Sequence, residues 1–183
     1  VVAKDYTLKA DGAQVLFQQG ARLQLADKKA SAYTVKVPVR TKEGKLQEEK
    51  VVLAANASLH EGYLPYTTNN IIRSAFKFYD SVYGWGGLQQ SVDCSSFISN
   101  AYRTVGIFLP RNADEQETSA GIHKKMGNMN SAQRANVIKG LTPGSTLHMD
   151  GHVMLYLGSS NEIPYAIHSL GSHYTGGTRH SVM

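Results

Sequence analysis

The chain of 183 residues contains one cysteine, Cys94, and its position favours a role as a nucleophile. A thiol has a reference pKa of about 8.5 and reacts as its anion, so it needs a group that stabilises negative charge and a base that removes the proton. Cys94 follows the capable N-cap residue Asp93 at the predicted start of a helix, where backbone N–H groups and the helix dipole stabilise an anion. The alternative is that Cys94 packs as a small buried hydrophobic residue. A lone cysteine forms no internal disulfide in either case.

A later strand offers the base. Between His152 and Leu157 the side chains alternate, so that Val153 and Leu155 share one face of the strand and His152 lies on the other, facing a cleft. His168, on the next predicted strand, can orient the first ring through a nitrogen-to-nitrogen hydrogen bond and so select the tautomer that accepts the thiol proton. The alternative is that each histidine is a half-buried, hydrogen-bonded ring with no catalytic role.

The first 60 residues contribute strands to the framework that must position these groups. Residues 33–40 alternate apolar and polar side chains, which is typical of a strand with one buried face, and Pro38 predicts that this strand lies at a sheet edge. A turn at residues 42–45 and a strand at 50–53 complete a hairpin, and residues 16–17 and 23–25 are further strand candidates. Short strands at this spacing predict a small barrel or sandwich, to which we assign no chemistry.

The second half of the chain places helices before strands. Helices are predicted at 70–81, ending before Gly84, from Cys94 to Gly106, and more weakly at 112–120 and 131–139. After a turn at Pro143-Gly144, strands are predicted at 145–149, 152–157 and 165–169. This order predicts an α+β fold rather than alternating βαβ units.

Six motifs, in chain order, are similar to those of the NlpC/p60 family of papain-like cysteine peptidases, which cut bacterial peptidoglycan stem peptides. They are residues 83–87 (YGWGG), 93–97 (DCSSF), 109–111 (LPR), 143–144 (PG), 151–158 (GHVMLYLG) and 166–168 (AIH). The resemblance covers about residues 66–170, and the N-terminal part more weakly resembles bacterial SH3-like domains. It implies an SH3-like β-barrel at 1–62 followed by an α+β, papain-like catalytic domain at 63–183, with helices packed on an antiparallel sheet.

The resemblance also implies a role for individual residues. Cys94 is then the nucleophile, His152 the general base and His168 the third, polar member of the triad. Tyr83 lies beside the oxyanion region, and the cleft that holds the amino end of the stem peptide is lined by Asp93, Ser95 and Arg111. The implied reaction is hydrolysis of the bond between γ-D-glutamate and the next diamino acid, without a metal or other cofactor. Many family members have glycine in place of Ser96 and Met154, which changes the shape of the subsites.

Charge and hydropathy restrict the partners. Nineteen basic and fourteen acidic residues give a formal charge of +5, which favours anionic partners such as cell-wall polymers. The basic residues are scattered, so we expect no nucleic-acid binding. No apolar run approaches about 18 residues, so we expect no membrane insertion. The start of the chain lacks the features of a signal peptide, which fits a mature protein that is secreted or in the cell envelope and binds stem peptides or muropeptides as a monomer.

Three other functions remain open. His148, Asp150 and His152 could share a strand face as metal ligands, although a turn at Asp150-Gly151 would break that face. The chain could be an inactive cell-wall-binding module, or the same Cys-His pair could serve an amidase or acyltransferase. For Arg111 a structural salt bridge competes with recognition of a substrate carboxylate, and Trp85 is expected to pack on the glycine-rich loop. Tyr63 and Tyr66 could line one wall of the cleft.

Overall fold

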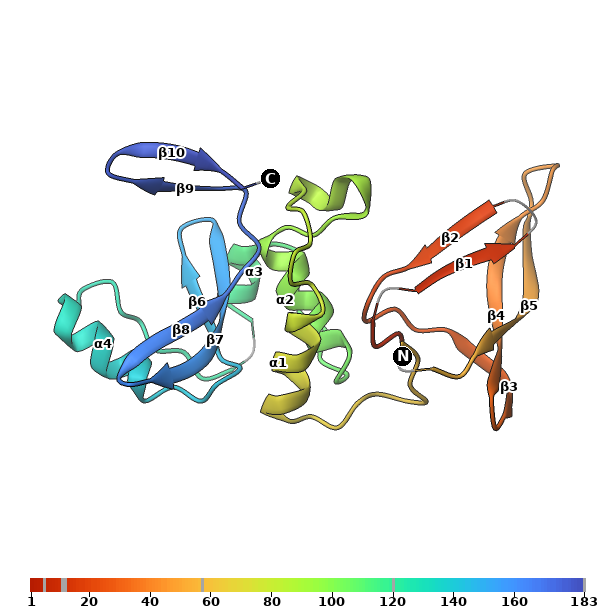
Figure 1. Cartoon of the computed structure of the whole chain (residues 1–183), viewed down its shortest axis with the longest axis horizontal. Helices are drawn as coiled ribbons and strands as arrows, with labels where there is room; N and C mark the ends of the chain where they lie inside the picture. The colour runs from red at the N-terminus through yellow and green to blue at the C-terminus, as the bar shows by residue number, and fades with distance from the viewer. Residues whose placement is uncertain (5, 11–12, 57, 120, 183) are drawn as a thin grey trace. The chain divides into compact units, whose positions relative to one another are not determined.

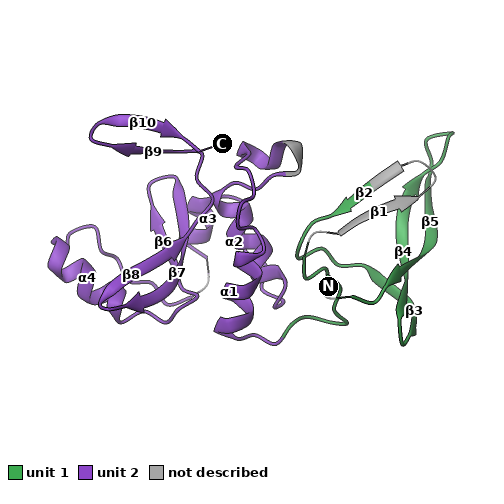
Figure 2. Cartoon of the chain, in the orientation of Figure 1, with its two compact units in different colours: residues 1–64 green, residues 65–183 purple. Residues whose placement is uncertain are grey.

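A computed structural model of the chain describes residues 1–4, 6–10, 13–56, 58–119 and 121–182. It divides into two compact units, residues 1–64 and 65–183, which are coloured separately in Figure 2. Each unit is described by itself below. The prediction of an SH3-like domain at 1–62 and a papain-like peptidase domain at 63–183 stays a prediction.

The first unit is built from two antiparallel sheets (Figure 1). The first pairs β1 (Tyr6–Ala10) with β2 (Ala13–Phe17), and the second has the order β3 (Gln24–Lys29), β4 (Ala32–Arg40), β5 (Leu46–Ala54). The alternation predicted along residues 33–40 is confirmed, because Val35 and Val37 are buried and form a core with Leu53. The assignment of this unit as an SH3-like barrel remains a prediction.

The prediction that Pro38 marks an edge strand is wrong for the strand as a whole. β4 is the central strand of its sheet, but its partners in β3 end at Lys36, whereas Pro38 pairs with Glu48 of β5. Proline has no N–H to donate, so it is tolerated where a strand has a partner on one side only. The expectation that proline lies on an unpaired strand side therefore holds for the end of β4 and not for its full length.

The second unit has the α+β organisation that the sequence predicts. Its helices are α1 (Thr68–Phe76), the 3-10 helix η1 (Trp85–Gln90), α2 (Cys94–Arg103), α3 (Ala113–Glu117) and α4 (Ser131–Lys139). The antiparallel strands β6 (Thr146–Met149), β7 (His152–Ser160) and β8 (Ile163–Ile167) form one sheet, and β9 (Ser172–Thr175) pairs with β10 (Thr178–Ser181).

α2 is the central helix of this unit and contacts both α1 and β7 (Figure 1). Phe97 and Ile98 on α2 are buried, as are Val153 and Leu155 on β7, and the Phe97 ring meets Phe78 edge to face at 5.9 Å between centroids. Full burial of each such side chain contributes about 1.5–3 kcal/mol to folding. The apolar faces of α2 and β7 thus bring the helix that begins at Cys94 against the strand that begins at His152.

Several boundaries differ from the predictions. α1 begins after the N-cap Thr67 and ends at Phe76 rather than at 81, because the chain then turns, with Asp80 at φ +66°. α2 ends at Arg103, a few residues before Gly106. α4 has the predicted bounds. η1 and the β9–β10 hairpin were not predicted, although the Gly176-Gly177 pair between β9 and β10 is a typical two-residue hairpin turn.

Candidate active site

Cys94 is the first residue of α2, and the cap that precedes it is complete. Oδ1 of Asp93 accepts the backbone N–H of Ser96 at 2.8 Å, and Oγ of Ser96 accepts the backbone N–H of Asp93 at 2.9 Å. This capping box holds the first turn of α2 in place, so the free N–H groups and positive end of the helix lie at Cys94. The residue is 8 % exposed and its thiol is free. The predicted helix start is confirmed.

The two histidines of the sheet are hydrogen-bonded to each other. His152 Nε2 lies 2.8 Å from His168 Nδ1, and the rings meet at 68° with centroids 5.1 Å apart. His152 is half-buried at the start of β7, and His168 is more exposed just after β8. The structure thus contains the predicted nitrogen-to-nitrogen contact. Among the described residues, His152 Nδ1 has no hydrogen-bond partner, which leaves that nitrogen available to a reacting group.

Partial burial keeps this pair neutral. Desolvation lowers the pKa of both rings, and the charge of a protonated His168 lowers the pKa of His152 further. One proton lies between the two facing nitrogens, because two N–H groups cannot point at each other across 2.8 Å. When His168 Nδ1 accepts that proton's hydrogen bond, His152 carries hydrogen on Nε2 and has a lone pair on Nδ1. In that tautomer His152 can act as a base.

Asp93 has a second role as the centre of a polar network. Its carboxylate accepts a bidentate pair of hydrogen bonds from Arg111, at 3.2 Å to Oδ1 and 2.6 Å to Oδ2, and Arg111 also reaches Ser95 Oγ at 3.0 Å. Burial alone would raise the pKa of Asp93, but the hydrogen bonds from Arg111 and Ser96 outweigh it and set the pKa at about 2. Asp93 is therefore ionised throughout the neutral range.

Arg111 forms a salt bridge with Asp93, which is one of the two roles that the sequence suggested for it. Asp93 and Ser95 are 6 % and 4 % exposed, whereas the Arg111 side chain is 47 % exposed. The hydrogen bond to Asp93 raises the pKa of Arg111, so the guanidinium stays charged. The three predicted residues are brought together at the start of α2, and only Arg111 offers a large exposed surface. Binding of a substrate carboxylate there remains a prediction.

η1 connects to this network through its backbone. Gly86 N–H donates to Asp93 Oδ2 at 3.1 Å, and Gly86 adopts φ +70°, a conformation that suits glycine. The expectation that Trp85 packs on this loop is wrong, because its side chain is 79 % exposed. The loop is instead held by hydrogen bonds of its backbone, which leaves a large aromatic surface free next to the network.

Tyr83 immediately precedes the loop that leads into η1. Its backbone forms a parallel bridge with Val92, two residues before Cys94. Partial burial raises the pKa of Tyr83, and the negative charge of the nearby Asp93 carboxylate raises it further. The phenol therefore keeps its proton in the neutral range and can donate a hydrogen bond. Tyr83 also lines a cavity of about 420 Å³ whose other walls include His168, Phe78, Phe97, Val92 and Val182.

Two further residues act on the site and were missed by the sequence analysis. The buried Gln116 of α3 donates to the carbonyl oxygens of Ser95 at 3.0 Å and Pro110 at 2.8 Å, and so ties the first turn of α2 to the segment before Arg111. Ser169 donates from Oγ to the carbonyl oxygen of Val92 at 3.0 Å. Neither residue has a local sequence pattern that marks it, because both contacts join distant segments.

The alternative of a metal site requires His148, Asp150 and His152 to share one strand face, and the structure does not have this arrangement. Asp150 and Gly151 form the two-residue turn between β6 and β7, so Met149 pairs with His152 and the proposed shared face is interrupted. His148 Nε2 lies 3.0 Å from Thr146 Oγ1. Within the described parts of the chain, no three His, Cys, Asp or Glu side chains lie close enough together to hold a metal ion.

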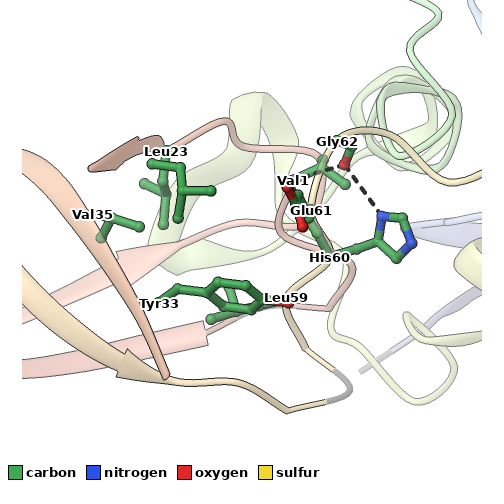
Figure 3. A pocket seen from close by; sticks show the side chains of 9 residues that line it. Val1, Leu23, Tyr33, Val35, Leu59, His60, Glu61 and Gly62 are labelled. Carbon is green, nitrogen blue, oxygen red and sulfur yellow. Dashed lines mark hydrogen bonds between the residues drawn. The ribbon is translucent and has the colours of Figure 1, made fainter. Parts of the chain in front are cut away.

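The first unit has a pocket of a different character, which is shown in Figure 3. Its volume is about 70 Å³, and apolar side chains of Leu23, Tyr33, Val35 and Leu59 line it beside residues 60–62. The expectation that this part of the chain has no chemistry of its own stays a prediction. Tyr63 and Tyr66 belong to different units, so their role as a common wall stays a prediction.

Comparisons with known proteins identify the class of protein. The model of the NlpC/P60 family matches residues 80–175, just over half of the chain, and the chain therefore belongs to this family. No curated protein sequence matches it significantly. Among the described residues, no helix combines the length and apolar character needed to cross a bilayer.

Solved structures give the same fold. An NlpC/P60 endopeptidase from Photobacterium damselae subsp. piscicida superposes with a TM-score of 0.62 at 22% identity, over 89% of this chain and 38% of the other. An NlpC/P60 family protein from Bacillus cereus ATCC 10987 superposes with a TM-score of 0.59 at 19% identity, over 91% and 56%. The chain thus spans about two fifths to just over half of the length of these proteins, and the α+β, NlpC/P60 fold class is confirmed.

Proposed function

We propose that this protein is a cysteine endopeptidase that hydrolyses peptidoglycan stem peptides, at the bond between γ-D-glutamate and the following diamino acid. NlpC/P60 membership implies a cell-wall peptidase. The observation that carries the finer proposal is the 2.8 Å contact between His152 Nε2 and His168 Nδ1, which leaves His152 Nδ1 free, on a strand that packs against the helix beginning at Cys94. A neutral, oriented base and a thiol at a helix N-terminus are the two requirements of this chemistry.

In the proposed reaction, His152 Nδ1 removes the proton from Cys94, and Sγ attacks the carbonyl carbon of the scissile amide. The resulting tetrahedral oxyanion collapses with cleavage of the C–N bond, and the imidazolium of His152 returns the proton to the departing amine. This leaves a thioester on Cys94. A water molecule, deprotonated by His152, then attacks the thioester carbonyl, which releases the carboxylic acid and the thiol. His168 holds the Nε2–H of His152 through both halves of the cycle.

The polar network at the start of α2 fits the amino-terminal side of the substrate. Arg111 combines a fixed position with an exposed guanidinium, and Asp93 and Ser95 fix that position. Tyr83 carries a neutral hydroxyl near Cys94 and serves as a donor to the developing oxyanion or to the substrate backbone. We assign substrate-positioning roles to these four residues.

The setting follows from the substrate. Peptidoglycan lies outside the cytoplasmic membrane, so the protein would be secreted or held in the cell envelope, where it would act as a monomer on stem peptides or muropeptides. The net charge of +5 favours approach to an anionic wall polymer. No cofactor is needed, because the base and the nucleophile both belong to the chain.

The direct test is incubation of the purified protein with synthetic stem tripeptides and tetrapeptides, followed by mass analysis of the products. Fragments cut after γ-D-glutamate support the proposal, and the Cys94→Ala and His152→Ala variants should yield none. Cleavage of the amide that links the peptide to the sugar would instead indicate an amidase. Intact peptides together with slow alkylation of Cys94 at neutral pH would favour an inactive binding module.

A further inference from the structure

The segment that follows His168 contacts the stretch of chain that leads to Cys94. Ser169 is one residue after His168, and its Oγ–H donates to the carbonyl oxygen of Val92 at 3.0 Å, although 77 positions separate the two residues. Val92 is 3 % exposed and lies two residues before Cys94. This specific hydrogen bond therefore connects the segment that carries His168 with the segment that carries the nucleophile.

The Val92 carbonyl oxygen is a junction of three segments. It also accepts the backbone N–H of Gly84 at 3.2 Å, beside the bridge between Tyr83 and Val92. A carbonyl oxygen has two lone pairs, and these two donors occupy both. The loop before η1, the approach to Cys94 and the segment after His168 are thus joined at one atom of a buried residue.

A second contact from the same segment sets the place of the Tyr83 ring. A Cβ atom at Gly171 would lie 2.9 Å from Cδ1 and 3.0 Å from Cε1 of Tyr83, and the shorter of these separations is one that Cβ atoms in proteins essentially never show. Gly171 does not have a positive φ, so its backbone would accept alanine. Glycine is needed at this position for space alone, because the Tyr83 ring lies directly against the backbone.

We propose that residues 169–171 form a positioning segment, in which Ser169 holds the histidine pair in register with Cys94 through Val92 and Gly171 sets the Tyr83 ring beside the nucleophile. The inference rests on the proposed function, since it concerns the geometry of that reaction. Neither residue touches the reacting atoms, and both act through others. The segment begins one residue after the third member of the triad, so a displacement of its backbone is passed on to His168 as well.

Gly171→Ala is the first test, with Gly127→Ala as its matched control. Gly127 also lacks a positive φ and has open space where a Cβ would stand. Because small displacements of catalytic groups cost up to about 100-fold, we expect Gly171→Ala to lower kcat about 10-fold or more with little change in KM. Gly127→Ala should stay within about twofold of the wild type on the same scale.

The double variant Gly171→Ala/Tyr83→Ala shows whether the effect passes through the ring. Removing the ring removes the three atoms that the new Cβ would meet, so Gly171→Ala should cause no further loss in the Tyr83→Ala background. An equal loss in both backgrounds would overturn the role assigned to Gly171. This comparison remains informative if the single variant Gly171→Ala folds poorly.

Ser169→Ala tests the other contact, and Ser169→Thr, which keeps the hydroxyl, should restore the activity. Alkylation of Cys94 by iodoacetamide, measured from about pH 5 to 9, provides a readout that does not depend on peptide hydrolysis. We expect Ser169→Ala to slow alkylation at neutral pH about threefold or more, because the histidine pair loses its register with the thiol. If the wild type does not cleave stem peptides, the proposed function is refuted but the positioning segment is not. Alkylation profiles of Ser169→Ala and Gly171→Ala that match those of the wild type and Gly127→Ala would refute the positioning segment.

Discussion

The two ends of the candidate site are held by different kinds of interaction. At the start of α2, the Asp93 carboxylate is ionised and receives hydrogen bonds from Arg111, Ser96 and Gly86. At the sheet, two neutral rings share one hydrogen bond, and partial burial lowers the pKa of both. The Asp93 carboxylate stays ionised and hydrogen-bonded throughout the neutral range, whereas the single contact between two neutral rings can exchange its proton. We therefore regard the Asp93 network as the framework of the candidate site, and the His152–His168 pair as the part that can transfer protons.

The largest loss of activity is expected from substitution of Cys94 or His152, the proposed nucleophile and base. Cys94→Ala removes the sulfur that would form the proposed acyl-enzyme, so we expect stem-peptide cleavage to fall by about 10⁴-fold or more, to the limit of detection. The small residue leaves little cavity, so the thermal midpoint should change by only a few degrees. His152→Ala should be nearly as severe. Cleavage that survives in either variant would show that the reaction runs elsewhere.

His168→Ala should be milder. Water can replace an orienting acceptor in part, so we expect kcat to fall about 10- to 100-fold, and His168→Asn or His168→Gln should recover some of the loss. Steady-state kinetics on one stem peptide checks the ranking of the variants. A loss as great as that of Cys94→Ala would mean that His168 does more than orient His152.

The pH dependence of activity separates the two ends further. His152 must be unprotonated to act as a base, and its pKa is lowered from 6.5 by burial and by the charge of His168. The acid limb of kcat/KM should therefore have its midpoint below pH 6.5, with activity lost as the pH falls. In His168→Ala that midpoint should move back towards 6.5. A limb that stays in place would show that His168 does not influence the charge on His152.

A change at Asp93 should alter the free energy of unfolding in a way that depends on pH. The pKa of Asp93 is about 2 in the folded protein, against 3.8 for an unperturbed aspartate, so ionised Asp93 contributes roughly 2 kcal/mol above about pH 4, which is lost as the pH falls towards 2. In Asp93→Asn this contribution is absent at every pH. Urea unfolding from about pH 2 to 7 should show a difference between the two proteins that is full above about pH 4 and disappears near pH 2. The lowered histidine pKa values, which cost stability below pH 6.5, affect both proteins equally, so a pH-independent difference would contradict the assignment.

Sequence reasoning recovered the parts of this comparison that depend on local rules. The cap at Asp93, the start of α2 and the bounds of α4 follow from side chains that bond to neighbouring backbone groups. The contact between His152 and His168 was predicted because the sequence places both residues on adjacent strands of a hairpin, and it forms although His168 lies one residue beyond the end of β8. Gln116, Ser169 and Gly171 act across long sequence separations, and their neighbours become known only when the chain has folded. The role of Pro38 shows the same limit, because the length of its partner strand decides whether it lies at an edge.

The smallest effect is expected at Trp85. Its side chain is 79 % exposed on η1, so Trp85→Ala should change the free energy of unfolding by no more than about 0.5 kcal/mol. The matched change Phe97→Ala, at a ring that is 2 % exposed, should cost about 3–5 kcal/mol. An exposed indole held beside the network by the Gly86–Asp93 hydrogen bond can instead bind substrate, since flat aromatic surfaces pack on the apolar faces of sugars and peptides. In that case Trp85→Ala raises KM for muropeptides while kcat and stability stay near the wild-type values, and a loss of stability comparable to that of Phe97→Ala would show that the ring packs on the protein after all.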